Sequence, residues 1–399
     1  MTHCNGSSVD KLKEKNLNGH ASGHASGHTS SNVEDEVNAK YMRCLEEPYK
    51  YHTQVPGKAS ISTDEFELTK CKSPVPSHNV CLCGRGDIRK APIGEELEQD
   101  FLNLLFPKIR DQTIEAMNLW LGVEKNVLQK IKEVITMLHE ASLLIDDIQD
   151  NSKMRRGQPA AYLIYGISEV INIANLKYFE AGKIALELGS MTTAKNVDKS
   201  EASKIFHDWM IKLHQGQGLD IHWRDHYICP TVDEYIDMVL KKTGGLMMLA
   251  FDLMYIFRNQ SETKLVYDNG RKFLETFSKF FQIRDDFCNL WDVKYAANKS
   301  YCEDLTEGKY SWVIIQGIIK ERELGTTRVT SILKQRTTSD EIKSYCCQVL
   351  ESLKVKSETT ELLETLEKDL LEQIEGLGGN KMFIKIVGLL SPSRIQTVQ

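Results

Sequence analysis

Apolar residues recur every three or four positions over long stretches of this chain. Between residues 127 and 145 they follow the 3.6-residue period of an α-helix, and similar periodicity runs through 234–256, 271–291 and 359–375. No stretch alternates apolar and polar residues in the manner of a half-buried β-strand. The pattern predicts an all-α protein with several long helices packed around a central cavity.

The prolines divide the chain. Five of the nine lie between residues 56 and 107, and only Pro230 and Pro392 follow residue 160. Because proline disrupts helix interiors, the body of the chain is expected to be one large helical domain. The first residues are polar and carry a glycine-histidine-alanine-serine repeat, which predicts a disordered tail. The expected parts are a disordered tail (1–40), an N-terminal helix with a loop-rich insertion (41–107), the helical domain (108–390) and a C-terminal tail (391–399).

Charge and composition narrow the functional class. The net charge is −6, so no basic surface points to nucleic acid as a partner. No apolar stretch approaches the roughly 18–20 residues that span a bilayer, and no transmembrane segment is expected. The ten cysteines have no framework spacing, which is typical of reduced thiols. These features predict a cytoplasmic protein.

The most informative stretch is 143–157, where three aspartates close an apolar helical run and two arginines follow. One i,i+4 step places Asp146 and Asp150 on one helix face, about 6 Å apart. Like charges so close repel unless a cation bridges them. Hard oxygen ligands suit Mg²⁺, which typically takes one or two carboxylates and the oxygens of a phosphorylated substrate. The arginines then supply forked donors for phosphate, and the stretch predicts a site for Mg²⁺ and diphosphate.

A second acidic element lies at residues 280–290. It contains Asp285 and Asp286, with Asn289 completing a similar spacing and Gln282 one turn earlier. Two such helices facing each other would hold Mg²⁺ ions with a diphosphate between them. Metals there would stabilise the departing diphosphate when a carbon–oxygen bond ionises.

These motifs give the chain a family resemblance. It resembles the trans-isoprenyl diphosphate synthases, and among them the animal geranylgeranyl diphosphate synthases. The resemblance covers about residues 108–390. The matching stretches are Met-Leu-His-Glu-Ala-Ser-Leu-Leu-Ile-Asp-Asp-Ile-Gln-Asp-Asn-Ser-Lys-Met-Arg-Arg-Gly (137–157), Leu-His-Gln-Gly-Gln-Gly-Leu-Asp-Ile-His-Trp-Arg-Asp (213–225), Lys-Lys-Thr-Gly-Gly-Leu (241–246), Phe-Phe-Gln-Ile-Arg-Asp-Asp (280–286) and Asn-Lys-Ser-Tyr-Cys-Glu-Asp-Leu-Thr-Glu-Gly-Lys-Tyr-Ser (298–311).

The resemblance implies an isoprenoid-synthase-type helical bundle, a cofactor cluster of three Mg²⁺ ions, and a homodimer or higher homo-oligomer. It also implies a role for each matching residue. The implied metal ligands are Asp146, Asp147, Asp150 and Asp285. The implied contacts to the allylic diphosphate are Arg155, Lys242, Lys299 and Lys309. The residues implied to line the place where the allylic cation forms are Thr243 and Gln282. The implied contacts to the second substrate, isopentenyl diphosphate, are His139 and Arg156, with Lys58, Lys108 and Arg110 as further candidates. Of these, the aspartates, Lys242 and Gln282 are the expected catalytic residues.

The chain departs from the family pattern near its start. The family has a Gly-Lys-x-x-Arg element whose lysine and arginine hold isopentenyl diphosphate. Here Gly57 and Lys58 have no arginine after them, and a segment resembling an insertion separates them from Phe-Pro-Lys-Ile-Arg at 106–110. Arg110 is retained, whereas Lys108 is displaced by one residue. Loss of one charge-assisted contact costs roughly 1.5–3 kcal/mol, a ten- to hundred-fold weaker affinity.

Three functions therefore stay open. The first is a Mg²⁺-dependent synthase that condenses an allylic diphosphate with isopentenyl diphosphate to geranylgeranyl diphosphate; the small Ala141 and Ser142 before the aspartates leave room for a long product. The second is a terpene synthase on the same scaffold, converting geranyl or a longer diphosphate to a simple terpene because the second substrate binds poorly. The third is a non-catalytic regulatory subunit of a synthase. The sequence does not fix the product length, because the helix contacts that close the cavity are not visible in it.

Overall fold

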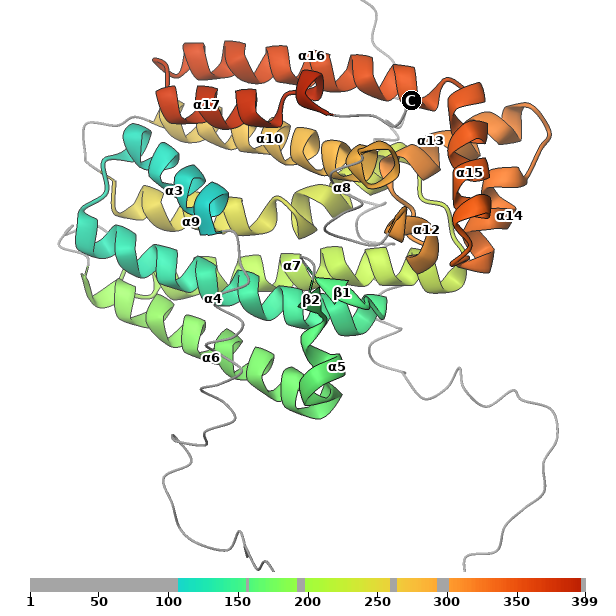
Figure 1. Ribbon diagram of the computed structural model, residues 1–399. Helices are drawn as coiled ribbons and strands as arrows, with labels where there is room; N and C mark the ends of the chain where they lie inside the picture. Colours follow the sequence, from blue (N-terminus) through green and yellow to red (C-terminus); the bar gives the residue numbers. More distant parts are fainter. Residues whose placement is uncertain (1–106, 156–157, 192–197, 259–263, 293–300, 396–399) are drawn as a thin grey trace, which may run out of the picture. The chain divides into compact units, whose positions relative to one another are not determined.

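A computed structural model describes residues 107–155, 158–191, 198–258, 264–292 and 301–395 (Figure 1). The chain divides into two units, Met1–Gly84 and Arg85–Gln399, and all of the described residues belong to the second. The predicted tail at 1–40 and the predicted insertion lie outside the described residues, apart from Pro107.

The described part is helical, which confirms the predicted all-α class. Its strands are the two-residue β1 (Met154–Arg155) and β2 (Gln158–Pro159), paired antiparallel. Its α-helices are α3 (Pro107–Leu121), α4 (Lys125–Asp150), α5 (Ala161–Tyr165), α6 (Ile167–Met191), α7 (Glu201–His226), α8 (Val232–Lys242), α9 (Gly245–Ile256), α10 (Lys264–Trp291), α12 (Glu303–Glu307), α13 (Trp312–Glu323), α14 (Arg328–Gln335), α15 (Asp340–Ser352), α16 (Val355–Gly376) and α17 (Lys381–Leu390), before a 3-10 turn at Pro392–Arg394.

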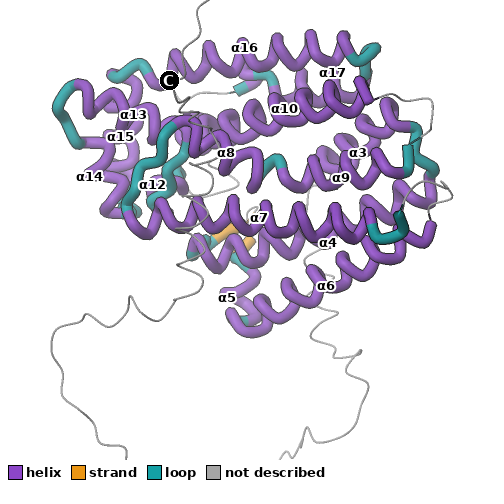
Figure 2. Tube along the Cα trace, turned by 180° about the vertical axis from the view of Figure 1, so that it is seen from behind, coloured by secondary structure: helices purple, strands orange, loops and turns teal. Residues whose placement is uncertain are grey.

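The helices stack in layers, as Figures 1 and 2 show from opposite sides. The long helices α4, α6 and α7 form one side of the bundle, and α10, α16 and α17 form the other, with α3, α8 and α9 between them. The short helices α12, α14 and α15 gather at the end where α7 finishes. No helix within the described ranges has the length and apolarity to cross a membrane.

The periodic apolar positions of α4 lie in the core, as the sequence pattern predicts. Val127, Ile131, Val134 and Leu138 are all buried. Farther from the aspartates, Trp120 of α3 stacks on Phe383 of α17 with ring centroids 4.9 Å apart. Such buried aromatic and aliphatic contacts supply most of the free energy that holds long helices together. Polar side chains, by contrast, cluster at the C-terminal end of α4.

The end of α4 is defined by a left-handed residue. Asn151 has φ 55°, and its N–H bonds to the carbonyls of Asp147 and Ile148. Asparagine tolerates this conformation better than most residues. The chain then turns back through β1, so Arg155 returns toward the aspartates that precede it.

Candidate active site

Asp146, Asp147 and Asp150 lie in the last turns of α4, where the turn into β1 brings Arg155 against them. The Arg155 Nε donates to Asp147 Oδ1 at 2.7 Å, and its Nη2 donates to Asp146 Oδ2 at 3.1 Å. One guanidinium thus joins two adjacent carboxylates. The arginine and two of the aspartates that the sequence predicted as partners of one phosphate and metal site are therefore neighbours in the structure.

Lys242 reaches the same aspartates from the end of α8. Its Nζ lies 2.5 Å from Asp220 Oδ2 on α7 and 3.6 Å from Asp146 Oδ1 on α4. This reach depends on Gly216, because a Cβ at that position would lie 2.7 Å from the backbone nitrogen of Lys242. The glycine lets α8 approach α7 closely enough for the lysine to bridge two helices.

One face of α7 carries further contacts to the end of α4. Gln217, Asp220 and Arg224 are spaced by three and four residues, which places them on a common side of the helix. Gln217 Nε2 donates to Asp146 Oδ1 at 3.1 Å. Arg224 Nη1 forms an ion pair with Asp150, and its Nη2 donates to the carbonyl of Gln149 at 3.0 Å.

The neighbouring charges set the protonation of the site. Burial alone would raise the pKa of Asp146, but Lys242 and Arg155 outweigh it and hold that pKa well below its usual value. Burial and then the charge of Asp146 raise the pKa of Asp150 to about 7. Burial would lower the pKa of Lys242, but the carboxylates of Asp220 and Asp146 raise it above its usual value. Asp146 and Lys242 are therefore both charged at neutral pH.

The two aspartates of the second acidic motif, on α10, lie in different environments. Asp286 is 1% exposed and accepts hydrogen bonds from Tyr235 Oη at 2.5 Å, the Trp312 N–H at 2.7 Å and Gln282 Nε2 at 2.8 Å. It anchors α8, α10 and the start of α13 to one another. Asp285 is half-buried beside it. Asp286 therefore has a structural role in the motif, while the ligand role of Asp285 stays a prediction.

Asn289, the last residue of the second motif, is structural in this protein. Its side chain is 6% exposed, and its Oδ1 accepts the backbone N–H of Asp304 at 3.2 Å. The amide therefore fastens α10 to α12 and leaves the aspartates of the motif to carry charge.

Lys309 adds a further cation between α12 and α13. Its Nζ lies 3.8 Å from Asp286 Oδ1 and 3.9 Å from Asp304 Oδ1. Burial would lower its pKa, but the carboxylates of Asp304 and Asp286 raise it well above the usual value. A charged lysine at this point is suited to the predicted contact with a diphosphate. Gln282 is tied to the end of α8, where it accepts a hydrogen bond from the Thr243 hydroxyl.

The donor set fits Mg²⁺. The carboxylates at the end of α4 are hard oxygen ligands, half-buried at Asp146 and Asp150 and buried at Asp147, and each is paired with a cation. Within the described residues, no three His, Cys, Asp or Glu side chains converge closely enough to enclose an ion by themselves. Substrate and water oxygens would have to complete the shell, as is usual for Mg²⁺.

The predicted site for isopentenyl diphosphate is described only in part. Lys58, Arg156 and Lys299 lie outside the described residues, as does the side chain of Lys108. Arg110 lies in the first turn of α3, where its Nε is 3.4 Å from Asp111 Oδ1. His139 is half-buried on α4.

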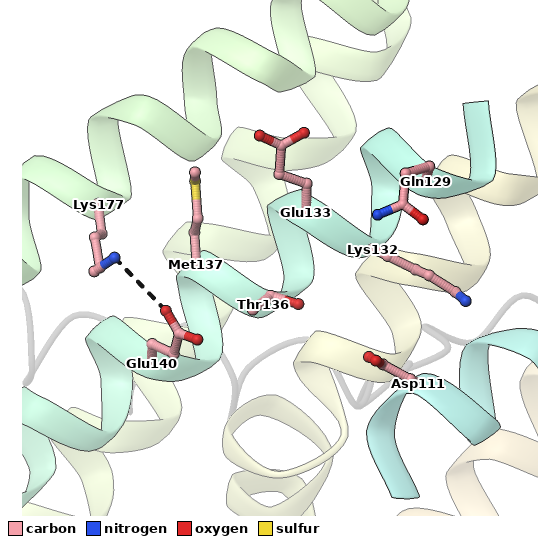
Figure 3. A pocket seen from close by; sticks show the side chains of 8 residues that line it. All are labelled: Asp111, Gln129, Lys132, Glu133, Thr136, Met137, Glu140 and Lys177. Carbon is pink, nitrogen blue, oxygen red and sulfur yellow. Dashed lines mark ion pairs between the residues drawn. The ribbon is translucent and has the colours of Figure 1, made fainter. Parts of the chain in front are cut away.

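A pocket of about 320 Å³ opens between α3, α4 and α6 (Figure 3). Its charged lining consists of Asp111, Lys132, Glu133, Glu140 and Lys177. Lys132 pairs with Glu115, and the buried Lys177 lies 3.6 Å from Glu140. Both lysines are thus matched by acids, and the pocket offers no excess positive charge to an anion.

Sequence reasoning missed several residues of this site. Arg224, Gln217 and Tyr235 contact the aspartate motifs but were assigned no role, and the buried partner of Lys177 was not foreseen. Arg224 does belong to the quoted stretch 213–225, where its spacing of four from Asp220 was a usable signal. Tyr235 gave no signal, because its partner lies fifty-one positions away on another helix.

The chain is similar in sequence to known polyprenyl synthetases and related enzymes. The polyprenyl synthetase family model matches residues 107–350. A terpene synthase of Matsumurasca onukii is 42% identical over 72% of this chain and 90% of that protein. A geranylgeranyl pyrophosphate synthase of Hericium erinaceus is 41% identical, covering 71% of this chain and 87% of its own length. One of Dictyostelium discoideum is 39% identical, over 72% of this chain and 89% of its own.

Proposed function

The chain belongs to the polyprenyl synthetase family, and from this premise we propose that it is a Mg²⁺-dependent geranylgeranyl diphosphate synthase. The observation that supports the proposal most is the end of α4, where Asp146, Asp147 and Asp150 meet Arg155 and Lys242. Carboxylates interleaved with cations are suited to a metal–diphosphate group. Several relatives of similar identity carry the same enzyme name.

In the proposed reaction an allylic diphosphate loses its diphosphate, and the double bond of isopentenyl diphosphate attacks the resulting cation. Mg²⁺, three ions in our proposal, would neutralise the departing diphosphate and be held by Asp146, Asp147, Asp150 and Asp285. Arg155, Lys242 and Lys309 would move from the carboxylates that they now contact toward the diphosphate oxygens. The hydroxyl of Thr243 and the amide of Gln282 would face the allylic cation, which their oxygen dipoles stabilise. Elongation ends with loss of a proton, for which the released diphosphate is a suitable acceptor.

Product length is proposed from the small residues before the aspartates. Ala141 is fully buried against the cluster formed with α5 and α6. The Ser142 hydroxyl bonds to the carbonyl of His139 in its own helix at 2.9 Å. Ser142, one turn before Asp146, is not bulky enough to block a long isoprenoid there, and the small Ala141 adds no bulk beside it.

A terpene synthase is the second candidate, and the start of α3 favours it. Arg110 pairs with its neighbour Asp111, and the adjacent pocket holds three acids against two lysines that are already paired. This environment is unfavourable for a second diphosphate. An allylic cation without an acceptor would lose a proton or capture water, which gives a terpene.

One assay separates the two functions. The full chain is incubated with Mg²⁺ and geranyl or farnesyl diphosphate, with and without isopentenyl diphosphate, and both elongated diphosphates and volatile products are measured. Elongation without volatiles supports the synthase. Volatiles that form independently of isopentenyl diphosphate support the terpene synthase. No turnover in any mixture would contradict both and favour the regulatory subunit. Asp146→Ala, which removes a proposed metal ligand, should abolish whichever turnover is seen.

We also propose that the protein is a cytoplasmic homodimer. The outer face of α6 carries large apolar side chains in contact with solvent, with Phe179 79% and Leu186 59% exposed. These two residues are seven apart and lie on one helix face with Leu176. Large apolar side chains exposed together on one helix face are typical of an interface, and a second copy would cover them.

A further inference from the structure

Arg224 caps the end of α4 with two different contacts. Its side chain is 9% exposed, Nη1 pairs with the carboxylate of Asp150, and Nη2 donates to the carbonyl of Gln149 at 3.0 Å. Both partners belong to the last turn of the helix, whose carbonyls lack intrahelical donors. One guanidinium therefore satisfies the helix end and fixes the last aspartate of the first motif.

The guanidinium of Arg224 is also bound on its Nε side, by Asp225. Its Nε donates to Asp225 Oδ1 at 3.1 Å, and the same oxygen accepts from Arg336 Nη2 of the α14 end, also at 3.1 Å. Arg336 Nη2 also lies 3.3 Å from the backbone carbonyl of Arg224. All three nitrogens of Arg224 thus have partners in three directions. Because every nitrogen of its guanidinium is bound, Arg224 is held in place, and no movement toward the substrate is proposed for it, unlike for Arg155 and Lys242.

The balance of charges around Asp150 determines how a fixed cation such as Arg224 would affect metal binding. Four aspartates face three cations across the ends of α4, α7 and α8: Asp146, Asp147, Asp150 and Asp220 against Arg155, Lys242 and Arg224. The substrate-free site is therefore close to neutral. A divalent cation arriving alone would meet the unit positive charge of Arg224 within a few ångströms of Asp150, and like charges at such distances repel strongly in a half-buried site.

We propose that Arg224 is a positioning residue that acts through Asp150: it orients this carboxylate and keeps the Mg²⁺ affinity of the substrate-free protein low. The inference rests on the proposed Mg²⁺ site. A metal that arrives with a diphosphate brings its own counter-charge, which offsets the local repulsion from Arg224. Arg224 thereby couples metal binding to diphosphate binding, because any group that disfavours one ligand alone makes the two mutually dependent.

The test measures Mg²⁺ affinity without turnover. The full chain and its variants are titrated with Mg²⁺ alone by isothermal calorimetry, after thermal denaturation has shown that each variant is folded. Arg224→Gln should bind Mg²⁺ about ten-fold more tightly than the wild type, since one opposing charge is removed. Arg224→Lys keeps the charge and should stay within about two-fold.

Arg271→Gln is the matched control. Arg271 pairs with Asp252 between α10 and α9 at 2.7 Å, so its loss also breaks an interhelical arginine–aspartate pair. It should leave the Mg²⁺ affinity unchanged even though it lowers the melting temperature. If Arg224→Gln does not fold, Arg336→Gln loosens the same brace, and an affinity gain of about three-fold is expected.

Equal or weaker Mg²⁺ binding by Arg224→Gln, or by Arg336→Gln where that variant stands in, would overturn the inference. So would a gain of the same size in Arg271→Gln. If neither the wild type nor Arg224→Gln binds Mg²⁺ alone, the inference also fails. Repeating the titration with inorganic diphosphate then tells the two failures apart: binding by the wild type leaves the proposed function standing, whereas its absence removes the proposed metal site itself.

Discussion

At the scale of single residues, Asp111 lies against Arg110, the side chain that we predict to contact isopentenyl diphosphate. The two side chains are 3.4 Å apart and are 18% and 41% exposed for the arginine and the aspartate. Asp111→Asn removes the competing charge while keeping the shape. We expect the KM for isopentenyl diphosphate to fall about three-fold, the modest effect typical of an exposed pair.

Steady-state kinetics with varied isopentenyl diphosphate measures this change. Glu323→Gln, at the exposed end of α13, removes a charge remote from α3 and should leave the KM where it is. An unchanged KM in Asp111→Asn would mean that Arg110 does not bind this substrate.

Tyr235 is the second residue whose contribution can be isolated. Its hydroxyl donates to the buried Asp286 at 2.5 Å, and the tyrosine is 1% exposed. Tyr235→Phe keeps the ring but leaves the carboxylate with one donor fewer. We expect the free energy of unfolding to fall by roughly 1.5–3 kcal/mol, the usual range for a hydrogen bond to a charged group.

Urea denaturation followed by circular dichroism tests this expectation. Tyr345→Phe, at a position 46% exposed on α15, is the matched control and should change stability by less than about 0.5 kcal/mol. Equal stability of the two variants would show that Asp286 does not depend on the tyrosine.

The sequence identified residues whose partners lie nearby in the chain, and failed where partners come from distant helices. Asp146 and Arg155 share one stretch of fifteen residues, so their meeting at the end of α4 follows from local spacing. Arg224 and Tyr235 contact aspartates on other helices, and helix packing alone brings these pairs together. Periodicity shows which face of a helix is buried but not which helix covers it.

At the scale of helices, the close approach of α7 and α8 determines where Lys242 lies. Alanine in place of Gly216 would put its Cβ 2.7 Å from the backbone nitrogen of Lys242 and 2.9 Å from the Cβ of Lys241. Backbone cannot rotate away as a side chain can, so the two helices would have to separate. We expect Gly216→Ala to lower the free energy of unfolding by about 1–3 kcal/mol and to reduce turnover as Lys242 moves from Asp146.

Gly388→Ala is the matched control for Gly216→Ala, because it makes the same substitution at a helical glycine away from α7 and α8. Gly388 lies within α17, and a Cβ there meets nothing within 4 Å. Alanine should raise stability by roughly 0.5–1 kcal/mol, because glycine is a poor helix former. Thermal denaturation and turnover of both variants are compared with the wild type. If Gly216→Ala behaves as Gly388→Ala does, the approach of the helices is not needed.

At the scale of the whole molecule, the sequence predicted the fold class more completely than the site. A 3.6-residue period in long proline-poor segments allows little besides packed helices, and α4, α10 and α16 appear where periodicity placed them. The relative positions of the helix ends depend on close approaches such as that at Gly216. The apolar outer face of α6 was likewise missed, since a periodic pattern does not distinguish a core stripe from an interface stripe.

That face gives the last prediction, which concerns assembly. Phe179 and Leu186 project from one side of α6, where a charged side chain is compatible with water but not with an apolar interface. Phe179→Glu and Leu186→Glu should therefore convert a dimer to a monomer without unfolding the chain, as measured by light scattering after size exclusion. Leu324→Glu, which places the same charge at a position 65% exposed at the end of α13, should remain a dimer. A wild type that is monomeric at all concentrations, or a dimer that survives both α6 substitutions, would contradict the proposed interface.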